Sequence, residues 1–348
     1  MTTPASPDPR NVLTPEALTM MDAIARSGSF AAAARLLGKV PSALTYNVRQ
    51  LEDALDVLLF DRSSRQATLT AAGSELLDEG RRLLEQMDAV ASRVKRIATG
   101  WETQLGIAVD DVVSRSTLLD LCSDFYAECT VRSKSARGPA GVAATPPPTR
   151  LRLQTEVMAG TWEALVTGRA DLAIGVGTDR DVPSGVAVKE LGTVTFCFAV
   201  APHHPLAAAK EPLDDAEIVR HRAVAVADSA HRLAPMTVHL LAGQDVLTVS
   251  DMDAKIDALA RGVGCGYVPA AMARAAIAAG RLVVKKVQRS QPVARLGYAW
   301  RVAAGRDGEP RVAEPGLALS WWLERLEGAT TRRALLERHG NDAAASIA

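Results

Sequence analysis

The sequence predicts an α plus α/β protein, with a small helical unit, one long helix and a larger domain of alternating strands and helices. Three observations predict this order. Residues 13–70 contain three short helical segments and a basic loop, and residues 71–100 repeat apolar side chains at helical spacing. From Leu105 onward, short apolar strand segments alternate with helical segments. That alternation is typical of sheets covered by helices on both faces.

Residues 13–70 predict a winged helix-turn-helix. Thr14 and Pro15 are an N-cap and a first-turn proline, so the first helix begins there. Gly38 makes the turn before a third helix that begins at Pro41. The inward positions of this helix are spaced by four, three and four residues: Leu44, Val48, Leu51 and Leu55. Leu58, Leu59 and Phe60 are expected to pack beneath the helices. Such a module places one helix in a DNA groove.

The outward face of the third helix carries the groups that proteins use on base edges and phosphates. They are Ser42, Thr45, Tyr46 and Arg49. The alternatives are a solvated face with an Arg49–Asp53 pair, and a packing role for Tyr46. In the basic loop, Arg62 and Arg65 are expected to contact phosphates or the minor groove. The alternative for Arg62 is an ion pair inside the domain, and Arg35 is either a phosphate contact or a surface charge.

Charge alone gives no support to nucleic-acid binding. The chain has 40 basic and 40 acidic residues, and residues 11–70 hold six of each. Any affinity for DNA must therefore come from the segregation of the basic residues on one surface.

Composition limits the class of protein. A chain of 348 residues allows about two or three domains, and no apolar run approaches the ~20 residues that span a bilayer. Met1–Arg10 does not resemble a signal peptide, so we expect a cytoplasmic protein with a disordered tail at residues 1–12. The four cysteines form no CxxC pair and the six histidines no ligand-spaced motif, so we expect reduced thiols, no metal and no cofactor.

The long helix at residues 71–100 is expected to pair with a second copy of itself. Its apolar residues recur at spacings of three and four, which forms a seam too long for the core of so small a domain. They are Leu76, Leu77, Leu83, Leu84, Met87, Val90, Ala91, Val94, Ile97 and Ala98. Gly73 and Gly80 are expected to be weak points in it.

The remaining chain predicts the α/β domain. Strands are expected at 105–109, 151–156, 172–175, 195–200, 223–227, 247–249, 265–268, 282–285 and 296–300. Helices are expected at 116–128, 161–167, 214–219, 251–260, 270–278 and 317–326. A Gly-, Ala- and Pro-rich stretch at 132–149 is expected to be a flexible insertion, with a partner-binding segment as the alternative. A polar helix and a tail at 328–348 are expected to end the chain.

These residues resemble LysR-type transcriptional regulators. The resemblance rests on SGSFAAAARLL at 27–37, RQLEDALDVLLFDRSSRQATLTAAG at 49–73, GRADLAIG at 168–175, APHHPLA at 201–207 and GVGCGYVP at 262–269. It implies a DNA-binding domain at 13–70, a dimerising linker helix at 71–100 and a two-subdomain α/β effector domain like periplasmic binding proteins. Subdomain I would cover 101–197 and 298–327, and subdomain II 198–297.

The resemblance also implies partners. Promoter DNA, a small-molecule effector, a homodimer and a homotetramer built from two dimers are expected, and RNA polymerase is a further candidate. One departure from the family lies at Val40-Pro41, where the family commonly has Ser-Gln. Val40 cannot cap a helix and Pro41 cannot read an adenine, so base reading must shift to the other residues of the third helix.

Ligands of such sheets bind beyond the carboxyl ends of the strands. The candidate effector contacts at those ends and at the helix starts beside them are Asp111, Val112, Ser114, Thr161, Trp162, Gly175, Asp228, Ser229 and Ser250. Ser114 is equally suited to ordinary N-capping and Trp162 to packing, and Ser250-Asp251 are expected to cap a helix as well.

Two other functions are alternatives to a specific regulator. A sequence-tolerant DNA binder is favoured only by Val40-Pro41. An enzyme is disfavoured, because Gly262-x-Gly264-x-Gly266 enters a strand instead of a helix, and Ser229 and His231 lie too close in sequence to build a catalytic triad. We therefore expect no catalytic residues.

Overall fold

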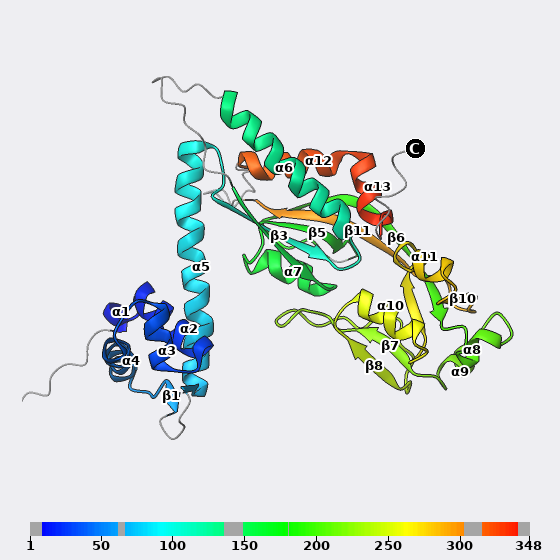
Figure 1. Ribbon diagram of the computed structural model, residues 1–348, viewed down its shortest axis with the longest axis horizontal. Helices are drawn as coiled ribbons and strands as arrows, with labels where there is room; N and C mark the ends of the chain where they lie inside the picture. The colour runs from blue at the N-terminus through cyan, green and yellow to red at the C-terminus, as the bar shows by residue number, and fades with distance from the viewer. Residues whose placement is uncertain (1–8, 62–66, 136–148, 180, 303–314, 340–348) are drawn as a thin grey trace, which may run out of the picture. The chain divides into compact units, whose positions relative to one another are not determined.

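The computed structural model describes residues 9–61, 67–135, 149–179, 181–302 and 315–339 (Figure 1). The chain forms two compact units, Met1–Val94 and Lys95–Ala348. None of the described helices is both long and apolar enough to cross a lipid bilayer.

The first unit has the predicted helix order, with a short two-stranded sheet. Its elements are α1 (Pro9–Val12), α2 (Pro15–Ser27), α3 (Phe30–Leu36), α4 (Pro41–Leu55), β1 (Phe60–Asp61) and β2 (Thr68–Leu69), the two strands being antiparallel. The Thr14 hydroxyl accepts the amide of Ala17 and caps α2, which ends at Gly28 in the left-handed region (φ 67°). Gly38 (φ 63°) makes the turn before α4.

The core of this unit comes from the predicted inward faces. Met21, Ile24, Ala33, Leu44 and Leu51 are almost completely buried and form one cluster. Leu59 and Phe60 join them, but the prediction for Leu58 was wrong, since this side chain is 54% exposed. The extended chain before β1 turns alternate side chains to opposite sides, so three consecutive residues cannot all face inward.

Two glycines in the first ten residues of α5 (Ala71–Thr99) lie in close contact with other parts of the first unit. A Cβ at Gly73 would lie 2.0 Å from the carbonyl oxygen of Leu59, and one at Gly80 would lie 2.7 Å from Leu18. These glycines therefore let the helix pack against its unit, and their interpretation as weak points missed this role. Further along α5, one stripe of apolar side chains is at least half exposed: Leu83, Met87, Val90 and Val94.

The second unit is built on a seven-stranded mixed sheet. Its order is β10-β6-β11-β5-β3-β4, with β9 also paired to β6. The bounds are β3 (Gln104–Asp110), β4 (Arg150–Glu156), β5 (Leu172–Gly177), β6 (Val186–Val200), β9 (Gly266–Pro269), β10 (Val283–Lys285) and β11 (Val293–Arg301). β3 is parallel to β4 and β5, whereas β11 is antiparallel to β5 and β6.

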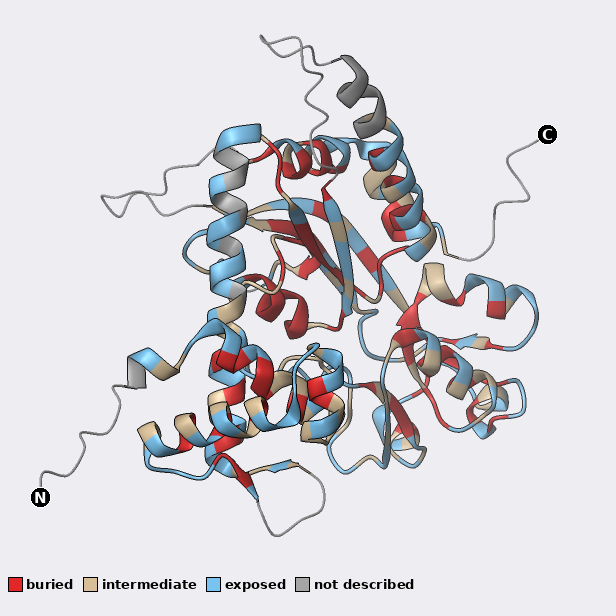
Figure 2. Cartoon of the chain, turned by 60° about the vertical axis from the view of Figure 1, so that its left-hand side comes forward, coloured by how far each residue is buried: buried red, intermediate tan, exposed pale blue. Residues whose placement is uncertain are grey.

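Helices cover both faces of the part of this sheet that contains β3, β5 and β11 (Figure 1). α6 (Arg115–Ser135), α12 (Leu317–Glu327) and α13 (Ala329–Glu337) lie on one face, and α7 (Ala159–Val166) lies on the other. Buried residues concentrate in the strands and on the inward sides of the helices (Figure 2). α6 continues seven residues beyond its predicted end at 128, and residues 136–148 of the predicted insertion lie outside the described part of the chain.

A second lobe follows the middle of β6. It contains α8 (Pro205–Ala208), α9 (Asp215–Ile218), β7 (Ala223–Val226), β8 (Val246–Val249), α10 (Met252–Ala260) and α11 (Ala270–Ala278). β7 and β8 form a separate parallel pair. We refer to residues 101–195 and 293–339 as lobe I and to residues 196–292 as lobe II.

One strand, β6, runs through both lobes. Residues 186–195 of β6 pair with β11, and residues 196–200 pair with β9 and β10. Because β11 pairs within lobe I from Val293 onward, we propose that the returning chain crosses at 286–292 instead of at residue 298.

Candidate functional site

The outward face of α4 presents the predicted polar side chains to solvent. Ser42 and Arg49 are exposed, Thr45 is half-buried and Tyr46 is 63% exposed. The Tyr46 hydroxyl accepts the amide group of Gln50 (2.9 Å), and the Thr45 hydroxyl donates to the carbonyl of Pro41 (3.1 Å). Among the described residues, Arg49 and Asp53 do not form the alternative ion pair, so the guanidinium is available to a ligand.

The beginning of α4 lacks a side-chain cap. Pro41 is its first residue, and Val40 makes no capping hydrogen bond. Pro41 has no N–H and the amide of Ala43 donates to the carbonyl of Val40 (3.0 Å), so the amide of Ser42 is left to water or to a ligand. Arg35 near the end of α3 is exposed, whereas Lys39 pairs with Glu16 and holds the pKa of that carboxyl below its usual range. Arg62 and Arg65 lie outside the described residues.

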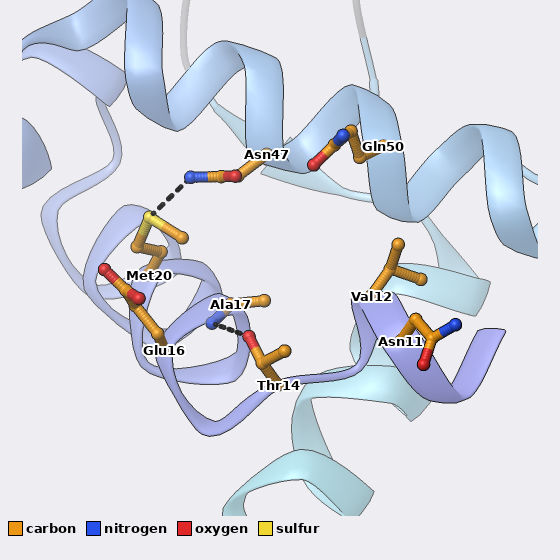
Figure 3. Close-up of a pocket in the computed structure, with 8 residues that line it drawn as sticks. All are labelled: Asn11, Val12, Thr14, Glu16, Ala17, Met20, Asn47 and Gln50. Atoms are coloured by element: carbon orange, nitrogen blue, oxygen red, sulfur yellow. Dashed lines mark hydrogen bonds between the residues drawn. The ribbon is translucent and has the colours of Figure 1, made fainter. Parts of the chain in front are cut away.

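A shallow hollow lies between α1, α2 and α4 (Figure 3). It is lined by Asn11, Val12, Thr14, Glu16, Ala17, Met20, Asn47 and Gln50. The Asn47 side chain turns towards the Met20 sulfur (3.5 Å), and this contact draws it away from the outward face of α4. The lining holds one carboxylate, which Lys39 already pairs, so the hollow lacks a set of convergent charged groups.

The core of this module depends on Glu52, a buried carboxylate. Its side chain accepts the amides of Leu59 (2.9 Å) and Phe60 (3.4 Å), and so ties the chain after α4 to that helix. Sequence reasoning missed this role, since a glutamate in an amphipathic helix ordinarily faces solvent.

In the α/β domain, the carboxyl end of β3 holds two acidic residues with different partners. Asp110 is buried in lobe I, where it accepts the amides of Val112 (3.2 Å) and Met158 (3.0 Å). Asp111 accepts the amide of Met252 (2.7 Å), which begins α10 in lobe II. Burial and the charge of Asp111 raise the pKa of Asp110 well above its usual range, and burial also raises the pKa of Asp111.

The segment after β7 crosses from lobe II to the start of α7 in lobe I. Asp228 accepts the amides of Ala159 (3.3 Å) and Gly160 (3.2 Å). The Ser229 hydroxyl accepts the amide of Val157 (2.9 Å) and donates to the buried Glu156 carboxylate. Asp228 and Ser229, candidate contacts at a strand end, thus face lobe I.

Close packing at this crossing requires a glycine. A Cβ at Gly160 would lie 1.8 Å from the Ser229 hydroxyl. Met158, two residues before Gly160, has a positive φ of 50°, a backbone conformation that residues other than glycine rarely adopt. Its amide is held by Asp110, so the polar contacts of lobe I fix a strained turn at the lobe boundary.

Several other candidate contacts are already occupied. Trp162 is buried and its indole N–H donates to the carbonyl of Gly177 (3.0 Å), which is the packing alternative. The Thr161 hydroxyl donates to Asp110 (3.3 Å), and Val112 lies in the core. Gly175 (φ 94°) leaves room for Asp110, because a Cβ there would approach the Asp110 Cβ to 2.6 Å. Ser250 is exposed and donates to Asp251, which caps α10.

Ser114 caps α6 and is completely buried beneath α13. Its hydroxyl accepts the amide of Thr117 (3.2 Å), and its own amide donates to the carbonyl of Leu335 (2.7 Å). Ser114 is therefore an ordinary N-cap of α6, one of the two roles for which its position was suited.

A buried lysine lies near this boundary, and sequence reasoning missed it. Lys255 is on the inward face of α10 with 9% of its surface exposed. Burial lowers its pKa to about 8, although Cys265 and Asp111 oppose the effect. Its only sequence signal is its position at the helical spacing of the buried Met252, Ile256 and Leu259.

Comparison with known proteins bears on both units. Residues 15–74 match the model of the bacterial regulatory helix-turn-helix protein, lysR family, and residues 140–312 match that of the LysR substrate binding domain. The chain is 38% identical over 314 residues to the probable HTH-type transcriptional regulator YhaJ of Escherichia coli strain K12, covering 90% of this chain and 96% of that one.

Other relatives agree with these matches. The uncharacterized HTH-type transcriptional regulator YeeY of the same strain is 35% identical over 311 residues, covering 89% of this chain and 92% of its own. The crystal structure of CbnR, a LysR family transcriptional regulator, has a TM-score of 0.55 at 18% identity, covering 90% of this chain and 98% of that chain. The structure of full-length CbnR with its target DNA has a TM-score of 0.54.

Proposed function

The chain belongs to the LysR family of DNA-binding transcriptional regulators with a substrate-binding effector domain, and from this premise we propose how it engages DNA and effector. We propose that α4 is the recognition helix and that promoter DNA is its target. The observation that carries this proposal is the exposed Arg49 on the face of α4 opposite the buried Leu44 and Leu51. Ser42, Thr45 and Tyr46 share that outward face, and Arg35 lies nearby in sequence, at the end of α3.

Binding of DNA from upstream of the gene tests this assignment. Arg49→Ala should weaken a footprinted complex by about 1–3 kcal/mol if the arginine reads a base. The matched control is Arg26→Ala, which removes an exposed arginine at the end of α2. Equal affinity of the Arg49→Ala and Arg26→Ala proteins would refute the role of Arg49.

A sequence-tolerant DNA binder is a second candidate, favoured by the uncapped start of α4 at Val40. Such a protein would bind all DNA with similar affinity, and the affinity would fall steeply with salt. A complex that protects one site against an excess of unrelated DNA would refute it.

We further propose that the chain is a dimer paired through α5. Four apolar side chains at least half exposed on one helical stripe are unfavourable in water, and a second copy of the helix would cover them. Two such dimers would form a tetramer and present recognition helices to half-sites separated by whole helical turns.

The effector site that we propose lies where lobe I meets lobe II, around Asp111, Asp228, Ser229 and Ser250. Asp111 and the Asp228–Ser229 pair already join the lobes through hydrogen bonds, so a ligand that replaced these bonds would change the angle between the lobes. A thermal-shift screen of small metabolites on the full chain tests this, since a bound effector raises apparent stability. Stabilisation by a hit that persists unchanged in Asp228→Ala would refute the location.

The same proposal includes a cytoplasmic location, contact with RNA polymerase at promoters and no catalytic activity. Regulation would then depend only on how effector binding changes DNA engagement.

A further inference from the structure

The last helix of the described chain, α13, covers the start of α6. The amide of Ser114 donates to the carbonyl of Leu335 (2.7 Å), and the hydroxyl of Thr117 donates to that of Ala334 (3.2 Å). The hydroxyls of Ser114 and Ser116 donate to the carbonyl of Arg338. The negative end of α13 thus meets the positive end of α6. The hydroxyls of Ser114, Ser116 and Thr117 therefore donate to backbone carbonyls at the end of α13 and are not available to a ligand in this arrangement.

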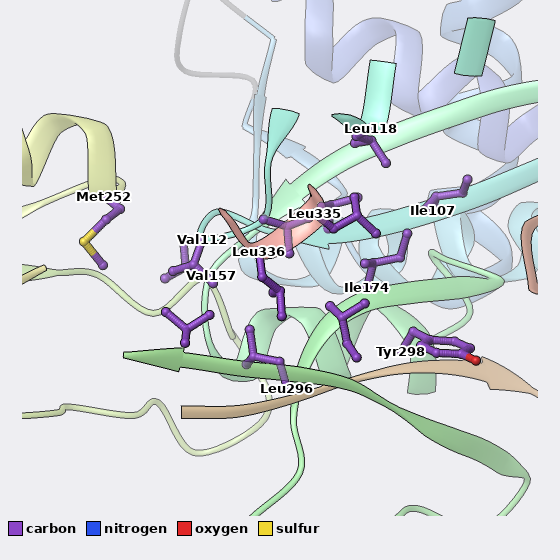
Figure 4. Packing of buried hydrophobic residues seen from close by; sticks show 14 of the residues in the cluster. Ile107, Val112, Leu118, Val157, Ile174, Met252, Leu296, Tyr298, Leu335 and Leu336 are labelled. Atoms are coloured by element: carbon purple, nitrogen blue, oxygen red, sulfur yellow. The ribbon is translucent and has the colours of Figure 1, made fainter. Parts of the chain in front are cut away.

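Two leucines of α13 are inserted into the core at the junction of the lobes (Figure 4). Leu335 and Leu336 are buried in one cluster with Val112 and Leu296 of lobe I and Met252 of lobe II. Leu336 also lies against β6, because a Cβ at Gly192 would approach it to 2.7 Å. This contact is four residues before the point at which β6 passes from lobe I to lobe II.

α13 also reaches lobe II directly. It contacts α11, and the half-buried His339, two residues after its end, lies within the electrostatic influence of Asp253 on α10 and Arg274 on α11. On the lobe I side, Arg338 pairs with Asp120 (3.1 Å).

The buried side chains of α13 are confined to its last turn, and one residue before that turn, Arg332, donates to the carbonyl of Glu190 on β6 (3.1 Å). Residues 328–330 and Arg333 are exposed, whereas Leu335 and Leu336 are the buried residues of this helix. The helix can therefore leave the surface without unfolding the strands beneath it, as elements with few buried contacts do.

We propose that α13 is an intramolecular strap that holds the two lobes at one angle and blocks the α6 hydroxyls until it is displaced. This rests on the proposed effector cleft: an effector bound at Asp111 that also bonded to Ser114, Ser116 or Thr117, three to six residues further along the chain, would first have to displace the last turn of α13. The strap would then oppose effector binding and set the angle between the lobes in the ligand-free protein.

Hydrogen exchange of the full-length chain, without DNA or ligand, tests the strap. Leu336→Asp should speed exchange at least tenfold at the amides of Val157 and Met252, which bond across the lobes. The matched control is Arg333→Asp, which places the same carboxylate on the exposed face of α13 and should leave these rates unchanged. Leu336→Ala should speed exchange at the same two amides, by a smaller factor than Leu336→Asp.

Two results would overturn the strap. One is faster exchange confined to α6 and α12, which would make α13 a local part of the lobe I core. The other is equal acceleration throughout the α/β domain, because a helix on which the fold depends cannot leave. Since neither DNA nor effector is used, failure here is separate from failure of the proposed function.

Discussion

Lys255 gives a stability prediction that can be worked out from its burial. The pKa of its ammonium falls from 10.5 to about 8 in the folded protein. Each pKa unit corresponds to about 1.36 kcal/mol, so burying the charged lysine costs about 3 kcal/mol at neutral pH. Lys255→Met keeps a long unbranched side chain without the charge. We therefore expect it to raise the free energy of unfolding of the α/β domain by up to about 3 kcal/mol at pH 7.

The gain has a defined dependence on pH. Because the folded-state pKa lies below the unfolded-state value, the unfolded chain binds more protons between pH 8 and 10.5. The stability of the natural protein therefore rises across this window, and the penalty is complete only below pH 8. The advantage of Lys255→Met should fall to less than about half by pH 9.5.

Urea unfolding followed by tryptophan fluorescence measures this difference. All five tryptophans lie in the unit Lys95–Ala348, so the signal reports that unit alone. Lys210→Met is the control, because Lys210 is exposed in the same lobe. A Lys255→Met protein that is less stable at pH 7, or whose gain is equal at pH 7 and 9.5, would refute the assignment of a buried charge penalty.

Three further substitutions test other contacts. Glu52→Ala should destabilise the first unit by about 2–3 kcal/mol in urea unfolding followed by circular dichroism, because the buried amides of Leu59 and Phe60 lose their acceptor; the exposed Asp53→Ala should have little effect. Gly160→Ala should cost about 1–3 kcal/mol by the fluorescence assay, since its Cβ would meet the Ser229 hydroxyl and the Glu156 carboxylate, whereas Gly177→Ala, whose Cβ would meet nothing within 4 Å, should cost much less; equal stability of the two variants would contradict the close packing at Gly160. Val90→Asp should weaken dimerisation at least about tenfold in sedimentation experiments whereas Asp88→Ala should not; an unchanged dimer would exclude the α5 stripe as the interface.

The fold class was predictable because its signals are local. Capping residues and apolar spacing gave α2, α3 and α4, and nearly every predicted strand lies within one or two residues of an observed one. The exceptions are β11, which begins three residues before the predicted strand, and above all β6, which begins at Val186, nine residues before its predicted strand. In lobe I it is an edge strand, so Lys189 and Glu190 can face water and interrupt the apolar alternation that the prediction relied on.

The candidate site was less predictable because its contacts join distant parts of the chain. The positions of Asp228 and Ser229 followed from the strand-end rule, and they do face lobe I. The partners of Ser114 could not be predicted, because Leu335 and Arg338 are more than 200 residues away in sequence and the segment that holds them looks polar. The burial of Lys255 also had no clear local signal, since lysine on a helix is ordinarily solvated.

The continuous strand β6 limits how the effector domain can move. One lobe cannot slide past or separate from the other while residues 186–200 remain in a single strand, because its hydrogen bonds to β11 and to β9 lie on consecutive stretches of the same backbone. Rotation must instead appear as added twist near residues 195 and 196, with the second crossing at 286–292 following. If a ligand rotates the lobes as proposed, β6 would act as a torsion element that turns its contacts into a rotation about one axis, and substitutions that stiffen this short segment should resist that rotation whichever lobe the ligand contacts.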